Sequence, residues 1–513
     1  MKKQIFVNII ASIIAFLVQM FISFGLTPLL VNALGEDAYG FIGLANNFVM
    51  YATVLTVAIN SIASRFISVE YNKGNIEKAN SYYSSLFFAN VVLSIIIFVI
   101  SIVITINLHS IIKIPQQLDF DVKLTFLLVF INFIFSLFHT TYQVVPFVKN
   151  KVSLVSIVTA LSNILKVIVI ICLFAILEPK IYYIAIAILA YSLVLLTLCI
   201  IISKKLSKEL KINIKSFDFD AIKTLVLSGF WNTINNLSRI LLTGFDLLIA
   251  NIFIGTYSMG ILSIAKNVPN AIETLLSTLA LAFVPNITIL YAKDKINDVV
   301  SEVKFSMKMV ALLMVVPIAG FTILGIDFYS LWLNKSIEEV KMIQLLSVLT
   351  LIPYMFSVCN YCLPNVDTVT NKLKRASIFT LIMSIATIIT EIIILKITNL
   401  GTIAIAGVSS FYWIIKVAIF NPLNAARNLK VKWYTFYPDF IKSLLCLILL
   451  LIIYSILHSF VNITSWSILF LVAIILGIIG YIISFAIILN KREKDIIIEK
   501  IVKILKKFKW IIL

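Results

Sequence analysis

The chain has 513 residues, of which 61% are apolar and 13% are charged, and a soluble fold of this length could not hide so much apolar surface from water. The mean hydropathy of +1.07 therefore predicts a membrane protein with many spans. The formal net charge is +18, which we attribute to cations at the inner ends of the spans and to contact with anionic lipid, not to nucleic-acid binding.

The apolar runs are long enough to cross a bilayer as helices. A hydrocarbon core about 30 Å thick needs roughly 20 apolar residues per helix, whereas membrane strands are shorter and alternate in polarity. We therefore expect an all-α polytopic fold with about 14 transmembrane helices. The expected spans are 5–32, 41–65, 84–108, 124–147, 152–177, 181–203, 224–251, 257–290, 306–327, 342–365, 376–396, 401–424, 442–462 and 466–490.

The N-terminal segment and the distribution of cations predict an orientation. The apolar run that follows Lys2 and Lys3 continues to Leu34 without a convincing cleavage site, so we expect the first span to remain as an anchor. Most Lys and Arg residues fall in alternate segments between the spans, and segments enriched in this way face the cytoplasm. Both termini are therefore expected in the cytoplasm.

Two segments that lie 220 positions apart share the spacing G-x4-G-x4-A-x-N. The matching residues are Gly35, Gly40, Ala45 and Asn47 in the first copy and Gly255, Gly260, Ala265 and Asn267 in the second. Six expected spans separate the copies, so both enter the membrane from the same side and the repeat is parallel, with a pseudo-axis along the membrane normal. A duplicated bundle of this kind is typical of a transporter whose site lies between its halves.

The repeat predicts two lobes of six helices, followed by an additional helix pair and a tail. The longest loop carries six lysines and falls where the first copy ends. The additional pair has no polar stripe and is expected to be peripheral, and the tail has the apolar and basic faces of an interfacial helix. The expected parts are 1–203 (N-terminal lobe), 204–223 (basic cytoplasmic linker), 224–424 (C-terminal lobe), 442–490 (helix pair) and 491–513 (cytoplasmic amphipathic tail).

Polar residues at helical spacing mark four of the expected spans, 5–32, 41–65, 224–251 and 257–290. In the span 224–251 the polar residues recur every three or four positions and so share one helical face. An Arg on that face would cost about 2.5–3.5 kcal/mol if it faced lipid at mid-depth. We therefore expect the four faces to line a solvated cavity. The candidate substrate-binding residues are Arg239, Lys266, Asn232, Asn236, Asn270, Gln19 and Asn60.

Ionisable residues inside the expected spans indicate the charge of the substrate. They are the cations Lys166, Arg239, Lys266 and Lys416 and the acids Asp246, Glu273 and Glu391. The surplus of cations favours an anion such as phosphate, and the three acids are the candidates for coupling an ion. Structural ion pairs, for example Arg239 with Asp246, are the alternative, although seven residues span about 10 Å along a helix.

The sequence predicts no cofactor and no metal site. Cys359 and Cys362 have a redox or metal-binding spacing, but no other cluster of Cys or His supports such a site. The chain has no P-loop, which excludes ATP hydrolysis within it.

The segments 34–40 and 254–260, together with the polar spans, resemble the multidrug/oligosaccharidyl-lipid/polysaccharide exporter superfamily, and within it the Wzx-type polysaccharide flippases of bacteria. The resemblance covers residues 1 to about 490 and rests on glycine turns and polar spans. It implies two lobes and a cavity lined by the first, second, seventh and eighth spans, where Arg239 and Lys266 match cationic positions. Gln19 stands where some relatives place a cation, so the site would not be symmetric.

The resemblance implies a transporter and not an enzyme. Such a protein would flip polyprenyl-diphosphate-linked oligosaccharide repeat units from the inner to the outer leaflet of the bacterial cytoplasmic membrane by alternating access, for surface polysaccharide biosynthesis. The expected partners are this lipid-linked oligosaccharide, membrane lipids and other membrane proteins of polysaccharide assembly. The alternatives are a cation-coupled multidrug antiporter of the same fold, a flippase for a peptidoglycan precursor, and a membrane glycosyltransferase or polymerase, which usually needs a large external loop with paired acids.

Overall fold

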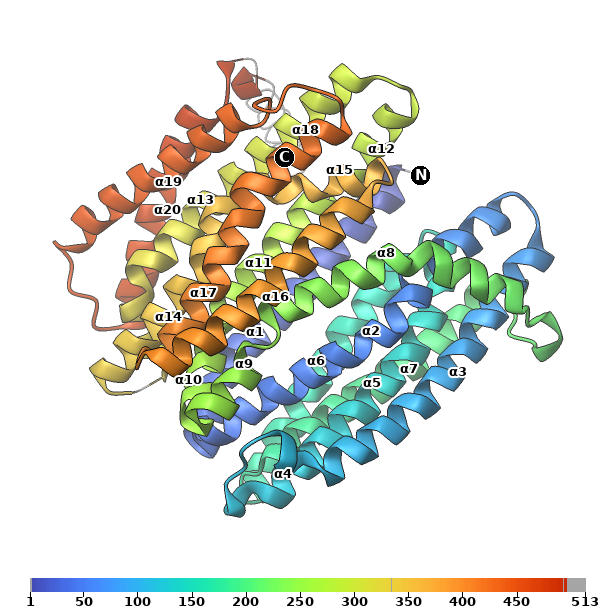
Figure 1. Ribbon diagram of the computed structural model, residues 1–513, viewed down its shortest axis with the longest axis horizontal. Helices are drawn as coiled ribbons and strands as arrows, with labels where there is room; N and C mark the ends of the chain where they lie inside the picture. Colours follow the sequence, from blue (N-terminus) through green and yellow to red (C-terminus); the bar gives the residue numbers. More distant parts are fainter. Residues whose placement is uncertain (1, 334, 492, 496–513) are drawn as a thin grey trace, which may run out of the picture. The chain divides into compact units, whose positions relative to one another are not determined.

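The computed structural model describes residues 2–333, 335–491 and 493–495, and every regular element within these ranges is a helix (Figure 1). The all-α prediction is therefore confirmed. Thirteen described helices are long and apolar enough to cross a membrane, and Val18–Leu34 adds a shorter apolar segment. This agrees with the predicted number of spans.

The long helices follow one another along the chain with short connections, and several are broken into shorter pieces. Their bounds are Lys2–Leu34 (α1), Glu36–Asn72 (α2), Ile76–Ile106 (α3), Asp119–Val148 (α5), Val152–Ile176 (α6), Ile181–Leu206 (α7), Phe219–Thr243 (α8), Asp246–Ile249 (α9), Thr256–Ala265 (α10), Asn267–Leu281 (α11), Val284–Ala292 (α12), Ile296–Leu333 (α13), Ile337–Ser357 (α14), Pro364–Val369 (α15), Leu373–Ile397 (α16), Thr402–Ile414 (α17), Asn421–Asn428 (α18), Tyr437–His458 (α19) and Trp466–Ile488 (α20). The shorter elements are Leu108–Ile111 (α4), Gln116–Leu118 (η1), Ile214–Ser216 (η2), Ala250–Ile254 (η3), Asn360–Cys362 (η4) and Ile415–Phe420 (η5).

The contacts divide the chain into two compact units. Of the described residues, unit 1 holds 2–264 and 377–405, and unit 2 holds 265–333, 335–376, 406–491 and 493–495. Unit 1 includes α8 because α8 packs along α2. It also includes most of α16, where the Ser238 hydroxyl of α8 donates to the Ser377 carbonyl at 3.3 Å. The division into sequence-derived lobes at 204–223 stays a prediction.

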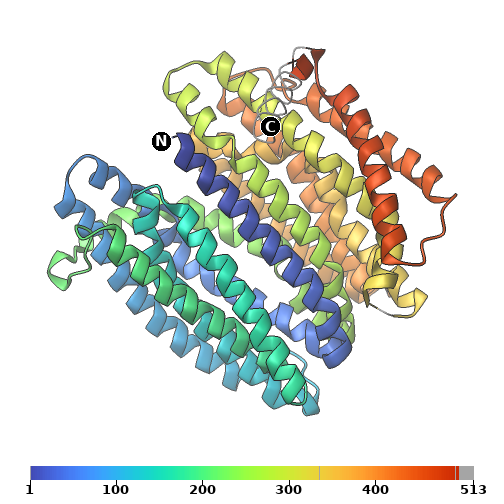
Figure 2. The ribbon, with the colours of Figure 1, turned by 180° about the vertical axis from the view of Figure 1, so that it is seen from behind.

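In unit 1, α2, α3, α5 and α7 form a bundle in which α2 packs on α3 and α5, and α5 packs on α7 (Figures 1 and 2). The bundle is filled by large apolar side chains that are almost completely buried, since helices with one apolar stripe must bury it against a neighbour. Phe41 and Leu44 of α2 and Phe126 of α5 are fully buried. The helices of unit 1 therefore form a packed scaffold for the polar residues described below.

In unit 2, α13 packs against α14, α19 and α20 (Figure 2). Tyr454 of α19 is fully buried, and its hydroxyl donates to the carbonyl of Leu476 in α20 at 2.7 Å. The same two helices carry exposed apolar residues such as Ile456 and Ile478, as expected for a lipid-facing surface. The amphipathic tail predicted at 491–513 lies almost wholly outside the described residues.

Candidate functional site

The polar stripe of α8 meets the polar stripe of α2 within unit 1. The backbones come close at Gly229, where an added Cβ atom would lie 1.9 Å from the carbonyl oxygen of Ala58. This approach allows amide groups on α8 to reach hydroxyl groups on α2: Asn232 donates to Ser61 at 3.2 Å, and Asn236 donates to Thr53 at 3.0 Å. Asn232 and Asn236 thus help to join the two helices.

The helix α8 ends where the sequence predicted a continuous span. The carbonyl of Gly244 accepts hydrogen bonds from the amide of Asn47 at 2.8 Å and from the hydroxyl of Tyr51 at 2.8 Å. These donors from α2 replace helical partners and stabilise the interruption. Asp246 begins the next short helix and is buried, with 3% of its surface exposed, so this acid lies beside a helix break in the interior of unit 1.

Asn60, another candidate, belongs to a hydrogen-bonded network inside unit 1. Its amide group and that of Asn90 exchange hydrogen bonds at 3.0 Å in each direction. The hydroxyl of Thr140 also donates to the Asn60 carbonyl oxygen, at 3.2 Å, and Asn90 donates to Thr141 at 2.9 Å. The network joins α2, α3 and α5, so Asn60 has a structural contribution whether or not it contacts a substrate.

Three candidates remain exposed, namely Gln19 on α1, Arg239 on α8 and Asn270 on α11. Among the described residues, the Arg239 guanidinium has no ion-pair partner, and Asp246 does not pair with it. A guanidinium within a membrane-spanning helix and without a carboxylate beside it must be solvated or bind an anion. Arg239 is therefore the candidate whose surroundings best suit anion binding.

Lys266 lies at a second helix break, in unit 2. Pro269 has no backbone N–H group, so the carbonyl of Ala265, four residues earlier, loses its helical partner. The hydroxyl of Ser347 in α14 donates to this carbonyl at 2.5 Å, and Ser347 is itself within 2.6 Å of the Tyr329 hydroxyl. The break between α10 and α11 is thus stabilised by α14, and it holds Lys266 in a largely buried position.

Glu273 of α11 is held by two tyrosines that the sequence analysis did not single out. The Tyr354 hydroxyl donates to one carboxylate oxygen at 3.0 Å, and the Tyr361 hydroxyl donates to the other at 3.3 Å. The Tyr354 ring lies 6.0 Å from the ring of Trp413, which has the Lys416 ammonium 5.4 Å from its centroid. Tyr354 lies in α14 and Tyr361 in the following η4, so no single helical face in the sequence marked the pair.

Two further charged candidates lie on α6 and α16. Glu391 of α16 is 1% exposed, and Lys166 of α6 has its ammonium 5.9 Å from the ring centroid of Tyr191. Cys359 and Cys362 are free thiols in buried positions. Within the described ranges, no group of three or more His, Cys, Asp or Glu residues is arranged to hold a metal ion.

Comparison with known sequences places the chain in a family. Residues 5–290 match the family described as polysaccharide biosynthesis protein. The chain belongs to this family. It is also 27% identical over 502 residues to the uncharacterized membrane protein EpsK of Bacillus subtilis (strain 168), a match that covers 96% of this chain and 97% of EpsK. With its many helices that could span a membrane, this member is a multi-pass membrane protein.

Solved structures share the fold. The lipid II flippase MurJ in an inward closed conformation superposes with a TM-score of 0.66 at 16% identity, covering 93% of this chain and 97% of MurJ. A multidrug resistance transporter of the MATE family, in the MOP superfamily and inward-facing, gives a TM-score of 0.64 at 12% identity, covering 83% of this chain and 99% of the transporter. These likenesses show a shared fold, and the expected link to polysaccharide biosynthesis proteins is confirmed by the family match.

Proposed function

We propose that this family member flips polyprenyl-diphosphate-linked oligosaccharides from the inner to the outer leaflet of the cytoplasmic membrane during surface polysaccharide assembly. The observation that carries the proposal is the exposed guanidinium of Arg239, which lies on a helix of a candidate membrane span and has no ion-pair partner among the described residues. The family description adds polysaccharide biosynthesis as the process. A diphosphate is the anionic part of such a substrate, and Arg can bind it through two parallel hydrogen bonds.

The other candidates have roles that follow from their chemistry. Lys266 is the other cationic candidate, and the exposed amides of Gln19 and Asn270 suit sugar hydroxyls. Asn232, Asn236 and Asn60 would contact the substrate only by exchanging their present partners. The two sequence-derived lobes, 1–203 and 224–424, would move as bodies during alternating access, with both termini in the cytoplasm.

The acids Asp246, Glu273 and Glu391 are the candidates for coupling an ion. Glu273 is the strongest of them, because two tyrosine hydroxyls fix its carboxylate. A carboxylate held in this way can bind a proton or a cation and exchange its hydroxyl partners when it does. Asp246 and Glu391 are more deeply buried, at 3% and 1% exposure.

A deletion strain tests the function directly. Without the protein, lipid-linked oligosaccharide should accumulate on the cytoplasmic leaflet, and surface polysaccharide should fall. Restoring the Arg239→Gln variant should recover little transport, because one charged hydrogen bond is worth about 1.5–3 kcal/mol, or roughly 10- to 100-fold in affinity. Lys166→Gln is the matched control, since it removes an embedded cation beside Tyr191. Equal transport by the Arg239 variant and wild type, at equal protein level, would refute the role of Arg239.

A second candidate function is export of cationic drugs in exchange for an ion. The tyrosine-bound carboxylate of Glu273 favours it, because a negative group can attract a cationic substrate. The same deletion strain separates the two functions. If the deletion strain kept its surface polysaccharide and became more sensitive to cationic drugs, the antiporter function would be supported in place of the flippase function.

A further inference from the structure

A cavity of about 520 Å³ lies at the end of unit 1 where α3 begins and α5 and α7 end. Its lining comes from these three helices and from the loop that follows α7. None of its lining residues belongs to α1, α2, α8, α10 or α11, so the cavity is separate from every residue proposed above for transport. Its volume falls within the range of small-molecule sites, roughly 300–1,000 Å³.

The loop that closes this cavity is fixed to α3 by hydrogen bonds. The backbone N–H of Lys211 donates to the side chain of Asn80 at 2.9 Å, and the backbone N–H of Asn213 donates to Ser84 at 3.0 Å. The side chain of Leu210, directly before Lys211, is buried and also anchors the loop. The cavity is therefore a preformed feature of unit 1 and does not depend on a loose linker.

The rim of the cavity is strongly basic. Lys204, Lys208 and Lys211 line it, and its lining includes no acid. The single acid between residues 204 and 216 is Glu209, whose carboxylate accepts a hydrogen bond from Tyr71 and lies 3.8 Å from the Lys149 ammonium. Glu209 is thus engaged elsewhere, and the three lysines keep a positive field over the cavity.

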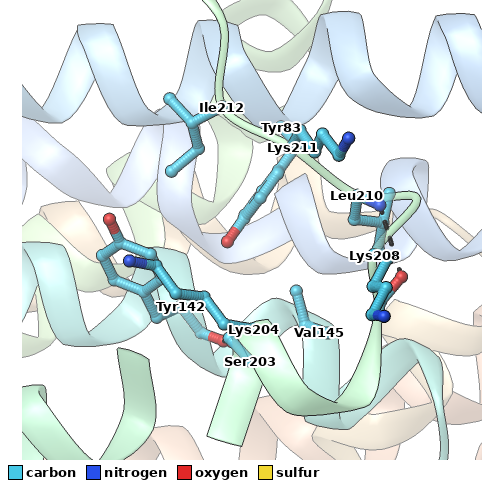
Figure 3. Close-up of a pocket in the computed structure, with 10 residues that line it drawn as sticks. Tyr83, Tyr142, Val145, Ser203, Lys204, Lys208, Leu210, Lys211 and Ile212 are labelled. Carbon is cyan, nitrogen blue, oxygen red and sulfur yellow. Dashed lines mark hydrogen bonds between the residues drawn. The ribbon is translucent and has the colours of Figure 1, made fainter. Parts of the chain in front are cut away.

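The floor of the cavity is aromatic and apolar. Figure 3 shows the Tyr83 hydroxyl pointing into the space between Tyr142, Lys204 and Val145. The backbone under Tyr142 is held by Ser203, whose hydroxyl donates to the Tyr142 carbonyl at 2.5 Å. On α7, Leu193 and Ile201 have 42% and 43% of their surface exposed, so this helix presents apolar side chains to its surroundings.

We propose that this cavity binds the phosphate group of an anionic lipid headgroup or of a soluble phosphate ester. Lysines bind phosphate as compact charges with several donors, and basic residues directly beside transmembrane helices are suited to anionic lipids. The tyrosine hydroxyls can donate to the same ligand, while Val145 and the tyrosine rings contact its glycerol carbons. The exposed apolar surface of α7 at Ile201 favours the lipid, because acyl chains can lie along it.

The test uses the full chain, purified in a neutral detergent, with three probes added in turn. The probes are short-chain phosphatidylglycerol, soluble glycerol phosphate and short-chain phosphatidylcholine, and binding is measured by native mass spectrometry and by the shift in Tm. We expect phosphatidylglycerol to bind and to raise Tm, since a ligand that binds only the folded state stabilises it. Phosphatidylcholine should have a much smaller effect. Equal effects of glycerol phosphate would identify a soluble phosphate ester as the ligand.

The loop offers a matched pair of variants. The first triple variant removes the cations that line the cavity and consists of Lys204→Gln, Lys208→Gln and Lys211→Gln. The second triple variant removes three exposed cations that do not line it and consists of Lys205→Gln, Lys215→Gln and Lys223→Gln. The first should weaken binding by roughly tenfold or more, and the second should leave it within about twofold of wild type. Equal weakening by both triples, or no binding of either phosphate probe to wild type, would overturn the proposal.

Discussion

Gly40 of α2 and Gly260 of α10 approach so closely that a Cβ atom added to Gly40 would lie 2.9 Å from the Cα atom of Gly260. The two residues occupy the same position in the two copies of the glycine-containing segment, 220 residues apart. Each copy also begins with a glycine of positive φ, Gly35 at +80° and Gly255 at +149°, and each of these glycines directly precedes a helix. Equivalent positions can touch only where they lie close to the axis that relates the copies.

Replacing Gly260 by Ala should destabilise the protein. The new methyl group would lie 2.2 Å from the carbonyl oxygen of Glu36, and backbone atoms must move to relieve the clash, at a cost of about 1–3 kcal/mol. Gly407→Ala is the matched control, because nothing lies within 4 Å of its added Cβ atom and alanine favours a helix. Thermal unfolding in detergent measures both variants. An unchanged Tm for Gly260→Ala would show that the two segments can separate freely.

The tyrosines around Glu273 give a prediction about coupling. Tyr354→Phe and Tyr361→Phe each remove one hydroxyl that donates to the carboxylate, so either variant leaves the Glu273 side chain less firmly held. We expect ion-driven transport to slow in either variant, while Glu273→Gln should abolish the dependence on an ion gradient. Tyr434→Phe removes an exposed hydroxyl and is the control. Unchanged ion-driven transport in all three variants would exclude Glu273 from coupling.

A buried ion triad joins α13 to α19 and to the segment that follows α20. The ammonium of Lys308 lies 2.9 Å from a carboxylate oxygen of Glu493 and 3.5 Å from one of Asp439. Only 6% of the Lys308 side chain is exposed, so Lys308→Met would leave two acids without their cation and should cost about 3–5 kcal/mol. The exposed pair Lys295–Asp298, at 3.9 Å, gives the control Lys295→Met, which should cost about 0–1 kcal/mol.

Comparing the two variants by chemical unfolding in detergent separates a stabilising triad from a surface contact. Equal midpoints for Lys308→Met and Lys295→Met would contradict the prediction. Exchanging all three members of the triad for apolar residues should restore much of the lost stability, because no uncompensated charge then remains.

The fold was predictable because it depends on local properties of the sequence. Apolar runs of sufficient length define spans, and the glycine-containing segments around Gly35 and Gly255 marked two helix starts. The polar face of α8 was also visible from spacing alone. What the sequence did not reveal is the partner of each polar group: Asn232 and Asn236 bond to α2, and Asn60 bonds to Asn90.

The missed features depend on packing between distant segments. Tyr354 and Tyr361 are 81 and 88 residues from Glu273, and neither is charged, so a search for embedded ions did not find them. The breaks at Gly244 and Lys266 were also missed. Each is stabilised by donors from another helix, Asn47 and Tyr51 in the first case and Ser347 in the second, and no local pattern specifies such donors.

Asp367, between the candidate spans of α14 and α16, makes stability depend on pH. Burial raises the pKa of its carboxyl group to about 7 from an ordinary 3.8, although hydrogen bonds from Asn428 and Asn424 and the charges of Lys416 and Arg375 oppose the rise. The two amides donate to one carboxylate oxygen at 2.7 and 2.8 Å. The folded protein therefore holds this proton more tightly than the unfolded chain does.

The sign of the pH dependence follows from this difference. Between about pH 4 and pH 7 the folded state binds more protons than the unfolded state, so the free energy of unfolding should fall as the pH rises and become level above about pH 7. The Asp367→Asn variant cannot ionise at this position and should lose this slope. Its stability relative to wild type should therefore be higher at pH 8 than at pH 5. Asp298→Asn, at an exposed position, should keep the wild-type slope. Unfolding curves measured in detergent from pH 4 to pH 8 test this, and parallel curves for wild type and Asp367→Asn would show that Asp367 does not bind the proton.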